Sequence, residues 1–265
     1  MSSSQLWPYA SPVNHESVSA IIRRRSTNKT DVREVALQGL DLSKIKRVLD
    51  LGCGFGFIEE VLADRVAPDA VFVGVDALKS NEPAFRGKVT RSGHRGGFVC
   101  RELDARLPWP TDRFDLVVCC YALYFFVEII PEVARVLAPD GVFLAITHYE
   151  KSIAGQLPAA GFEDAASRLL DLTRRFSAEN GRDLLGPHFG EINRIDYENS
   201  LQFTADDVEE LLRFLRFKLP FLVPDAKPGD DLPDSIARFA QVVMRRTGGL
   251  TVEKNDAIFQ CRRPR

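Results

Sequence analysis

The chain has 265 residues, of which 45% are hydrophobic and 27% are charged, and its formal net charge is −2. This composition is that of an ordinary globular protein rather than a disordered or collagen-like one. Because positive and negative charges nearly cancel, the chain has no general attraction to DNA, RNA or anionic lipid. We therefore expect neither a nucleic acid nor a membrane as the partner.

Residues 1–40 are expected to form an N-terminal arm and a lid helix. Residues 1–15 are polar and predict a loose arm without the apolar core of a signal peptide. Residues 16–25 place aliphatic side chains on one face of a short helix, and a second helix is expected over 31–39.

Strands and helices are expected to alternate over residues 41–150. The expected strands are short apolar runs, whereas the helices repeat their apolar residues at helical spacing. This alternation predicts an α/β fold with a doubly wound, seven-stranded, mostly parallel sheet. In chain order we expect strands at 46–51, 71–76, 98–102, 115–120 and 142–147, helices at 57–66 and 126–137, and a turn at 138–141.

The regular alternation of strands and helices ends after residue 150. We expect 151–217 to form a helical cap insertion, and 218–265 to complete the core sheet with its last two strands. Thr204, followed by two aspartates, is expected to cap a helix. The further elements expected are helices at 162–178 and 234–246, and strands at 218–224 and 257–262.

The segment 79–97 departs from the alternation, because it carries Pro83, several glycines and many basic residues. It predicts a solvated, mobile loop. The alternative is a contact surface for an anionic substrate or partner.

The five cysteines are odd in number, and no pair has the C-x-x-C spacing. The four histidines are scattered along the chain. We therefore expect no disulfide framework, no metal site, reduced thiols and a cytoplasmic location. The longest apolar runs fall short of the roughly 20 residues that a membrane helix needs.

A glycine loop follows the first expected strand, where residues 48–56 are VLDLGCGFG. Gly52, Gly54 and Gly56 allow a sharp turn and a close approach of the backbone to a ligand. The helix that follows offers free N–H groups to a carboxylate or phosphate. Asp50 adds an acceptor beside the loop. A tight turn without a ligand is the alternative.

Asp76 ends the second expected strand, 20 residues after Gly56. An acidic side chain there can accept hydrogen bonds from both hydroxyls of a ribose, although a solvated strand end is the alternative. A dinucleotide fingerprint would have glycine at position 57, where this chain has Phe57, so a nicotinamide site is disfavoured.

Together these segments resemble class I S-adenosylmethionine (SAM)-dependent methyltransferases. VLDLGCGFG resembles the first motif of that family and VFVGVD (71–76) the second. LDARLPWP (103–110), RFDLVVCCYALYFF (113–126) and VARVLAPDGVFLAIT (133–147) resemble the later ones. The resemblance covers about 45–148, in the family's order; the remaining third of the chain carries none. It implies that the seven-stranded sheet holds six parallel strands and a final antiparallel one.

The resemblance implies a role for each of thirteen residues. Glycine-loop residues would hold the methionyl part of SAM, Asp76 the ribose, and Asp104 with Ala105 the adenine edge. Lys29 would pair with the SAM carboxylate. The full cofactor set is Lys29, Asp50, Gly52, Cys53, Gly54, Gly56, Asp76, Ala77, Leu78, Asp104, Ala105, Cys120 and Tyr121.

Candidates for catalysis are His148 and Tyr121, at the ends of the fifth and fourth expected strands. Active sites of open α/β sheets lie at the carboxyl ends of the strands. His148 is a candidate general base, although a strand-end histidine bonded to backbone is the alternative. Tyr124 and Tyr149 lie nearby, and His188 and Tyr197 are candidates to reach the site from the cap.

We therefore expect a methyltransferase acting on a small-molecule acceptor. An RNA or protein methyltransferase is one alternative, and a non-catalytic subunit that binds SAM or its demethylated product (SAH) is another. A third is a SAM-using enzyme that transfers no methyl. DNA is not expected, because residues 119–122 are Cys-Cys-Tyr-Ala and lack the Asn/Asp-Pro-Pro-aromatic tetrapeptide that holds a flipped base. The acceptor atom and the oligomeric state are not predicted.

Overall fold

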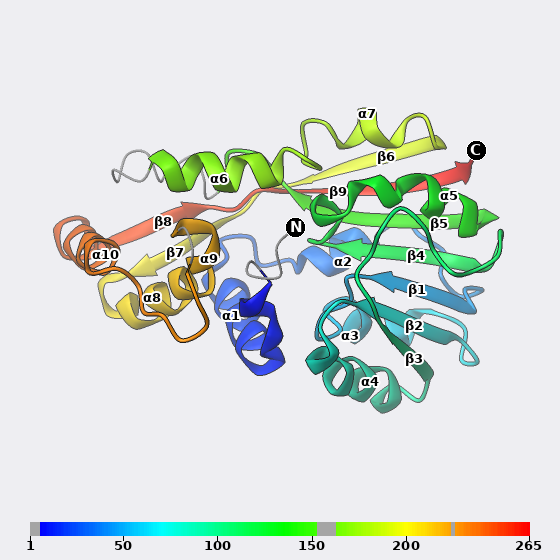
Figure 1. Cartoon of the computed structure of the whole chain (residues 1–265), viewed down its shortest axis with the longest axis horizontal. Coiled ribbons are helices and arrows are strands. Elements are labelled where there is room, and N and C mark those ends of the chain that lie inside the picture. Colours follow the sequence, from blue (N-terminus) through cyan, green and yellow to red (C-terminus); the bar gives the residue numbers. More distant parts are fainter. Residues whose placement is uncertain (1–5, 153–162, 224–225) are drawn as a thin grey trace.

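The structure is a computed structural model that describes residues 6–152, 163–223 and 226–265. A seven-stranded sheet forms its larger part, and a smaller lobe lies beside it (Figure 1). The order across the sheet is β3-β2-β1-β4-β5-β9-β6. Their bounds are β1 Arg47–Leu51, β2 Val71–Asp76, β3 Arg95–Cys100, β4 Phe114–Cys120, β5 Leu137–His148, β6 Phe189–Tyr197 and β9 Asp256–Pro264.

Strands β1 to β5 pair in parallel, as the alternation of strands and helices predicts. Strand β9 lies between β5 and β6 and runs antiparallel to both. The sheet therefore holds six strands of one direction and one reversed strand, which confirms the predicted fold class.

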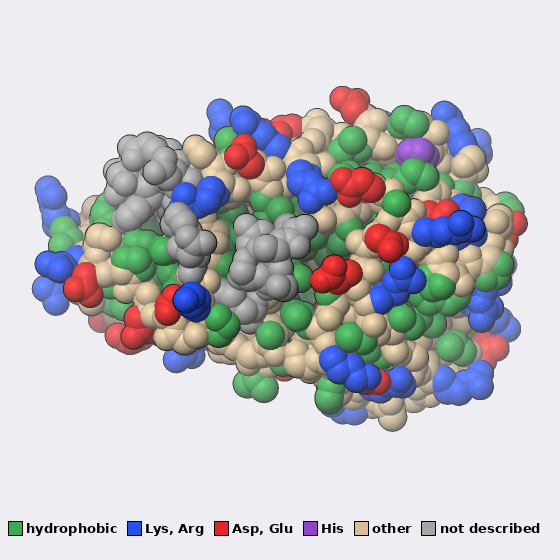
Figure 2. All heavy atoms as spheres, viewed as in Figure 1, with side chains coloured by type: hydrophobic (Ala, Val, Ile, Leu, Met, Phe, Trp, Pro, Cys, Tyr) green, Lys and Arg blue, Asp and Glu red, His purple; other side chains and the backbone are tan. Residues whose placement is uncertain are grey.

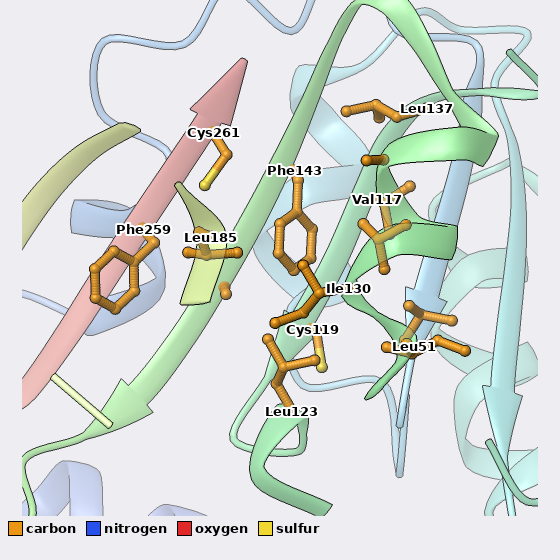
Figure 3. Packing of buried hydrophobic residues seen from close by; sticks show 14 of the residues in the cluster. Leu51, Val117, Cys119, Leu123, Ile130, Leu137, Phe143, Leu185, Phe259 and Cys261 are labelled. Atoms are coloured by element: carbon orange, nitrogen blue, oxygen red, sulfur yellow. The ribbon is translucent and has the colours of Figure 1, made fainter. Parts of the chain in front are cut away.

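Helices cover both faces of this sheet, because its central strands are apolar on both sides. Successive residues of β4 show the alternation: Val117 and Cys119 pack with α5 (Ile130–Val136) and α7 (Gly181–Leu185) on one face (Figure 3). Leu116 and Val118 pack on the other face. The helices of that face are α2 Val32–Ala36, α3 Glu59–Leu62 and α4 Glu82–Arg91.

The smaller lobe is built on a two-stranded antiparallel sheet of β7 (Ser200–Thr204) and β8 (Gly249–Glu253). Its core is formed by Leu201, Phe214, Met244 and other buried residues, together with Val18 and Ile21 from the N-terminal helix. Its helices are α1 Pro12–Arg25, α6 Glu163–Thr173, α8 Val208–Phe217, α9 Leu219–Leu222 and α10 Asp234–Thr247.

Two long strand runs connect the lobe to the sheet. Two residues separate the end of β6 from the start of β7, and two separate the end of β8 from the start of β9. The same pair of chain segments therefore passes from one sheet into the other, and α1 lies between the lobe and the sheet (Figure 1). This crossing places residues 198–199 and 254–255 at the junction.

Several expected elements are corrected by the structure. The strand expected at 218–224, whose last residue lies outside the described residues, is not formed over 218–223: Leu219–Leu222 is a short helix, whose first turn tolerates Pro220. The sixth strand of the sheet is instead β6, which lies within the range expected for the cap. The sequence pattern did not predict this strand, because its outward residues are polar and only one side of an edge strand is buried.

The segment 79–97 is also ordered, contrary to the expected loop. Helix α4 occupies Glu82–Arg91, with Pro83 in its first turn, and β3 already begins at Arg95. The N-terminal helix begins at Pro12 rather than 16, because the Ser11 side chain accepts a hydrogen bond from the N–H of Asn14. The segment 138–141 belongs to β5 instead of forming a turn.

The expected cap at Thr204 is confirmed. Its backbone N–H and its hydroxyl both lie 2.8 Å from Asp207 Oδ2, which forms a capping box before α8. On the face shown in Figure 2, acidic and basic side chains are interspersed, in keeping with the small net charge. No helix among the described residues has the length and apolarity to span a bilayer.

Candidate active site

A cavity of about 410 Å³ opens at the carboxyl ends of β1, β2, β4 and β5. This is the edge of a doubly wound sheet where ligands bind, and the volume lies in the range of small-molecule sites. Because β9 is antiparallel, its amino end reaches the same edge. Helix α1 and the segment between α8 and α9 supply the opposite wall, through residues such as His15, Val18, Phe217 and Lys218.

The glycine loop forms one wall of the cavity. Gly52, Gly54 and Gly56 have φ values of 72°, 50° and 81°, a region that disfavours any residue with a Cβ. A Cβ at Gly52 would also lie 2.5 Å from the Cβ of Ala122. The loop is held to β2, because the N–H of Gly52 donates to the Val75 carbonyl at 2.8 Å. Its backbone is thus shaped for close contact with a ligand.

Asp76 lines the cavity beside this loop. Its carboxylate accepts hydrogen bonds from the N–H groups of Gly54 and Leu78, both at 2.8 Å, and from the Asn81 amide at 3.2 Å. Each carboxylate oxygen has two acceptor sites, so Leu78 and Asn81 fill those of Oδ1, and one lone pair of Oδ2 remains for a ligand hydroxyl. Asp76 therefore both fixes the loop and presents an acceptor to the cavity.

Two buried carboxyl groups lie behind the loop. Burial, and then the charge of Glu59, raise the pKa of Asp50 well above its ordinary value. Burial likewise raises the pKa of Glu59 to about 7. No described group hydrogen-bonds Asp50 Oδ1 or either Glu59 oxygen within ordinary geometry. Such a pair favours a shared proton, or a cation close by.

His148 and Asp256 form a dyad on the floor of the cavity. His148 Nδ1 lies 2.7 Å from Asp256 Oδ1, and the two side chains are 16% and 1% exposed. Burial lowers the pKa of His148 to about 4, although Asp256 opposes this shift. Burial would raise the pKa of Asp256, but Lys254 and His148 hold it below its ordinary value. A neutral imidazole beside a carboxylate is therefore the stable state at neutral pH.

Tyr121 and Lys254 surround this dyad. The Tyr121 hydroxyl donates to Asp256 Oδ2 at 2.8 Å, and Lys254 Nζ lies 2.7 Å from the same oxygen. The Tyr121 ring stacks on His148 with centroids 4.7 Å apart. Tyr121 has φ of 57°, a strained conformation for a bulky residue and one that clusters at functional sites.

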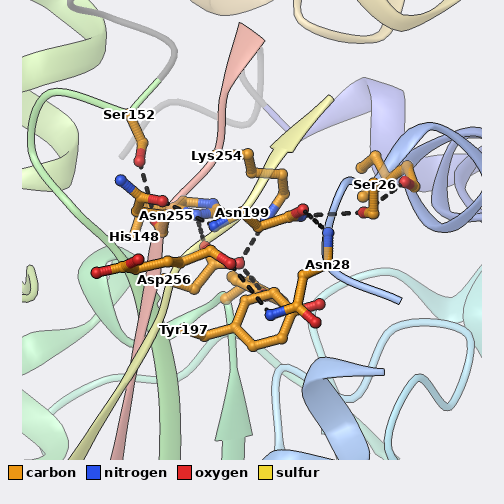
Figure 4. A network of polar contacts seen from close by, with 12 residues as sticks. Ser26, Asn28, His148, Ser152, Tyr197, Asn199, Lys254, Asn255 and Asp256 are labelled. Carbon is orange, nitrogen blue, oxygen red and sulfur yellow. Dashed lines mark hydrogen bonds and ion pairs between the residues drawn. The ribbon is translucent and has the colours of Figure 1, made fainter. Parts of the chain in front are cut away.

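Asn199 ties this floor to the rest of the wall at the junction of the two sheets (Figure 4). Its N–H donates to Asn255 Oδ1 at 2.8 Å, and its amide nitrogen donates to Ser26 Oγ at 3.0 Å. The N–H of Asn28 donates to Asn199 Oδ1 at 3.1 Å. One side chain therefore connects the lid segment after α1 to the strand that carries Asp256.

Helix α1 closes the cavity with aromatic contacts. The His15 ring lies 4.7 Å from the Phe55 ring of the glycine loop and 5.3 Å from the Phe217 ring, centroid to centroid. Burial, together with the charges of Lys218 and Lys88, lowers the pKa of His15 to about 3. Lys88 Nζ also bridges to Glu16 on α1 at 3.0 Å. This helix is thus held over the loop by both packing and charge.

The structure brings most of the predicted site residues to one cavity. Lys29 lines it with Nζ bonded to the Ser26 carbonyl, and Tyr124 and Tyr197 line it as well. The other predicted residues that line the cavity are Gly52, Cys53, Gly54, Asp76, Ala77, Leu78, Cys120, Tyr121 and His148.

Four predicted cofactor residues do not line the cavity: Asp50, Gly56, Asp104 and Ala105. Asp50 lies buried beneath the loop. The Asp104 side chain is 68% exposed and accepts from Arg101 at 3.3 Å, and Ala105 is exposed next to it. Tyr149 and His188 lie outside the lining too.

Sequence reasoning missed Asp256, Lys254, Lys218 and His15, all of which line the cavity. A signal existed for the first two. The polar run Lys254-Asn255-Asp256 directly precedes the final apolar strand. Because an antiparallel strand begins where its parallel neighbours end, that run must reach the active edge of the sheet. Lys218 and His15 lie in helical segments with no comparable signal.

Comparison with known families supports the fold. The model of a methyltransferase domain family matches residues 48–141. The crystal structure of the YcgJ protein from Bacillus subtilis covers 94% of this chain and 99% of its own, with a TM-score of 0.52 and 19% identity. BH2331 from Bacillus halodurans C-125 has a TM-score of 0.55 and 17% identity, covering 88% and 99%. Likeness at this level shows a shared fold.

Curated relatives match only part of the chain. The uncharacterized methyltransferase YcgJ of Bacillus subtilis is 34% identical over 106 residues, which are 39% of this chain and 41% of that protein. The demethylmenaquinone methyltransferase of Symbiobacterium thermophilum is 31% identical over 103 residues, 37% and 41% of the two. The nocamycin O-methyltransferase of Saccharothrix syringae is 35% identical, covering 41% of each. The chain thus matches less than half the length of these relatives.

Proposed function

The chain contains a class I SAM-dependent methyltransferase domain, and from this premise we propose that the protein transfers a methyl group from SAM to a small-molecule acceptor by in-line displacement. One observation carries the proposal: the positive-φ glycine loop and the His148–Asp256 dyad face the same cavity.

The residues around the loop fit SAM. The turn has no Cβ at Gly52, Gly54 and Gly56, and Asp76 keeps one free acceptor site for a ribose hydroxyl. The carboxyl pair of Asp50 and Glu59 lies behind the loop, where it favours a cation. We propose that Gly52, Cys53, Gly54 and Gly56 hold the methionyl part, with Lys29 as the partner of its carboxylate. Ala77 and Leu78 would flank the adenine, and Cys120 and Tyr121 would flank the reactive centre. Asp104 and Ala105 lie outside the lining, and we keep them as candidates for the adenine edge because they directly follow the lining residues 101–103.

SAM supplies an activated methyl group, so the protein must bind the acceptor in line, exclude water and, where the acceptor is protonated, remove a proton. We assign the last task to His148. Its Nδ1–H donates to Asp256, which leaves Nε2 as the basic atom. Its low pKa keeps the imidazole in the basic form at neutral pH.

A small acceptor is favoured by the residues that line the cavity. The cavity lining is rich in aromatic residues, with Tyr9, Phe125 and Phe217 among them, and residues of α1 contribute to it. Such walls suit a compact, partly apolar molecule. Two of the curated relatives are named for small-molecule methylation, of demethylmenaquinone and of nocamycin. A cytoplasmic location stays a prediction from the free cysteines.

Calorimetric titration of the purified protein with SAM and SAH tests the cofactor assignment. Wild type should bind both, and Gly54→Val should lose binding because position 54 has φ of 50° and faces the cavity. Gly93→Val is the matched control: its φ of 80° imposes similar backbone strain, but nothing lies within 4 Å of the added Cβ. It should keep wild-type affinity.

A screen of small phenols, amines and carboxylic acids for SAH release then tests turnover. SAM binding with no turnover on small molecules, but with methylation of RNA or protein, would contradict the small-acceptor proposal. SAM binding without turnover on any acceptor class would favour a non-catalytic subunit or a SAM-using enzyme that transfers no methyl. Absence of SAM binding would contradict the proposed function altogether.

A further inference from the structure

Lys218 is a cation on the acceptor side of the cavity that the proposed chemistry does not use. It lies between α8 and α9 as the capping residue of both, so its backbone is fixed by two helices. Its side chain lines the main cavity with His148, and also a small second cavity with Leu172 and Phe221. The glycine loop does not border that second cavity.

Within the described part of the chain, no carboxylate forms an ion pair with Lys218. Its nearest recorded partner is the Phe217 ring, whose centroid lies 5.7 Å from Nζ. Two buried lysines of the region, by contrast, are paired: Lys254 with Asp256 at 2.7 Å and Lys88 with Glu16 at 3.0 Å. Lys218 therefore presents three donors to the cavity without a counter-charge.

The surroundings of Lys218 leave this charge uncompensated. Burial, and then the charge of Lys254, lower its pKa to about 8, so the ammonium persists at neutral pH. The charge of Asp256 is already used by Lys254, and His148 is neutral. Lys218 is half-buried, and a charge partly withdrawn from water gains from an ion pair, so the site is stabilised by taking up an anion here.

We infer that the methyl acceptor carries a carboxylate, held by Lys218 in an ion pair while the nucleophilic atom faces His148. This assignment rests on the proposed methyltransferase function. Lys218 shares with His148 the lining of both cavities, the second of which the glycine loop does not border. Lys218 would thus select among acceptors and would not take part in proton transfer.

The test compares a carboxylate with its neutral amide in the SAH-loaded protein. The probes are 4-hydroxybenzoate against 4-hydroxybenzamide, and 3-(4-hydroxyphenyl)propionate against its amide. Binding is measured by calorimetry for wild type, Lys218→Met and Lys218→Arg. Lys44→Met, at an exposed position remote from the cavity lining, is the matched control.

Wild type and Lys44→Met should bind at least one carboxylate about tenfold or more tighter than its amide, as expected for a desolvated charge pair. Lys218→Met should erase this preference without changing SAH affinity, and Lys218→Arg should retain it. The inference is overturned if no carboxylate is preferred, if neither probe pair binds, or if Lys218→Met keeps the preference. It is also overturned if Lys218→Met weakens SAH binding, because Lys218 would then serve the cofactor. Failure of wild type to bind SAH would instead reject the proposed function.

Discussion

His148 and Asp256 are direct cross-strand partners on β5 and β9, with Nδ1 and Oδ1 2.7 Å apart. They lie 108 positions apart in the chain. The antiparallel register of β9 against β5 fixes this contact, since facing residues of such a pair lie close together. The last strand of the sheet therefore contributes to the site through its first residue.

The role of His148 as a base is tested by His148→Gln. With an acceptor that must lose a proton, we expect kcat to fall by about 10²–10⁴-fold, the usual contribution of a general base. SAH affinity should stay at the wild-type value, because His148 is not among the proposed cofactor residues. The measurement is SAH release under saturating SAM. The control is His188→Gln, outside the cavity lining, which should keep full activity. An unchanged kcat in His148→Gln would remove His148 from the reaction.

Tyr121→Phe separates a positioning role from proton transfer. The hydroxyl of Tyr121 donates to Asp256, and burial, then the charge of Asp256, raise its pKa well above the ordinary value. We therefore expect it to orient Asp256 and not to act as a base. The variant keeps the ring against His148 and should lose no more than about tenfold in kcat, the scale of one hydrogen bond. A loss of the size expected for His148→Gln would assign proton transfer to Tyr121.

The pH dependence of kcat/KM should follow the low pKa of His148. The basic form is present above a pKa of about 4, so the profile should be flat near neutrality and fall only as the pH drops toward that value. Asp256 raises this pKa, so Asp256→Asn should move the acid limb to lower pH and reduce the plateau. Rates from the SAH-release assay across a buffer series provide the measurement. An acid limb near the ordinary histidine value in wild type would contradict a buried, neutral base.

His15 should make the fold sensitive to acid. Its pKa is about 3 in the folded protein against an ordinary 6.5, so the unfolded state binds more protons between these values. The free energy of unfolding should therefore decrease as pH falls from about 6.5 toward 3. His15→Phe keeps the aromatic packing and removes this titration. As the pH is lowered from about 8 to about 5, the free energy of unfolding of His15→Phe should increase by about 1–2 kcal/mol relative to that of wild type, as measured by urea unfolding.

His15→Gln is the companion variant, since it also lacks a titrating group but packs differently. Both substitutions should flatten the pH dependence equally, whatever their stability at pH 8. If only His15→Phe changes the slope, aromatic packing and not titration is responsible.

Gly181→Ala tests the packing beneath β9. A Cβ at Gly181 would lie 2.6 Å from ring atoms of Phe259, which is fully buried. We expect a loss of about 1–3 kcal/mol in the free energy of unfolding, the cost of overpacking a core. Gly87→Ala, inside α4, is the opposite control: its Cβ meets only the end of the Arg91 side chain, so it should stabilise by about 0.5–1 kcal/mol. Equal effects of both variants would argue against a packing origin.

Local patterns were sufficient for the core of the fold. Strand β2 has the predicted bounds of 71–76, and the other four strands of the first half lie at or near theirs. These strands are buried on both faces, so their apolar runs stand out in the sequence. The glycine loop was recognisable for a similar reason, because its backbone conformation demands glycine at fixed positions.

Sequence patterns did not predict elements that are buried on one side only, or short segments whose secondary structure depends on tertiary packing. Strand β6 carries polar residues on its outer side. The run 219–222 is as apolar as a strand but folds as a helix within the smaller lobe. A short apolar run has no period that separates the two states. The helix over 82–91 was masked by proline and glycine, although Pro83 fits a first turn.

By itself, the sequence determined the class of sheet, the glycine loop at its edge and the candidates Asp76, Tyr121 and His148, because each depends on residues close in the chain. Only the tertiary structure decided what surrounds His148. Asp256 reaches it through strand pairing, and Lys218 and His15 reach the cavity from helices of the smaller lobe. Such contacts depend on how elements distant in sequence pack, which no local pattern encodes.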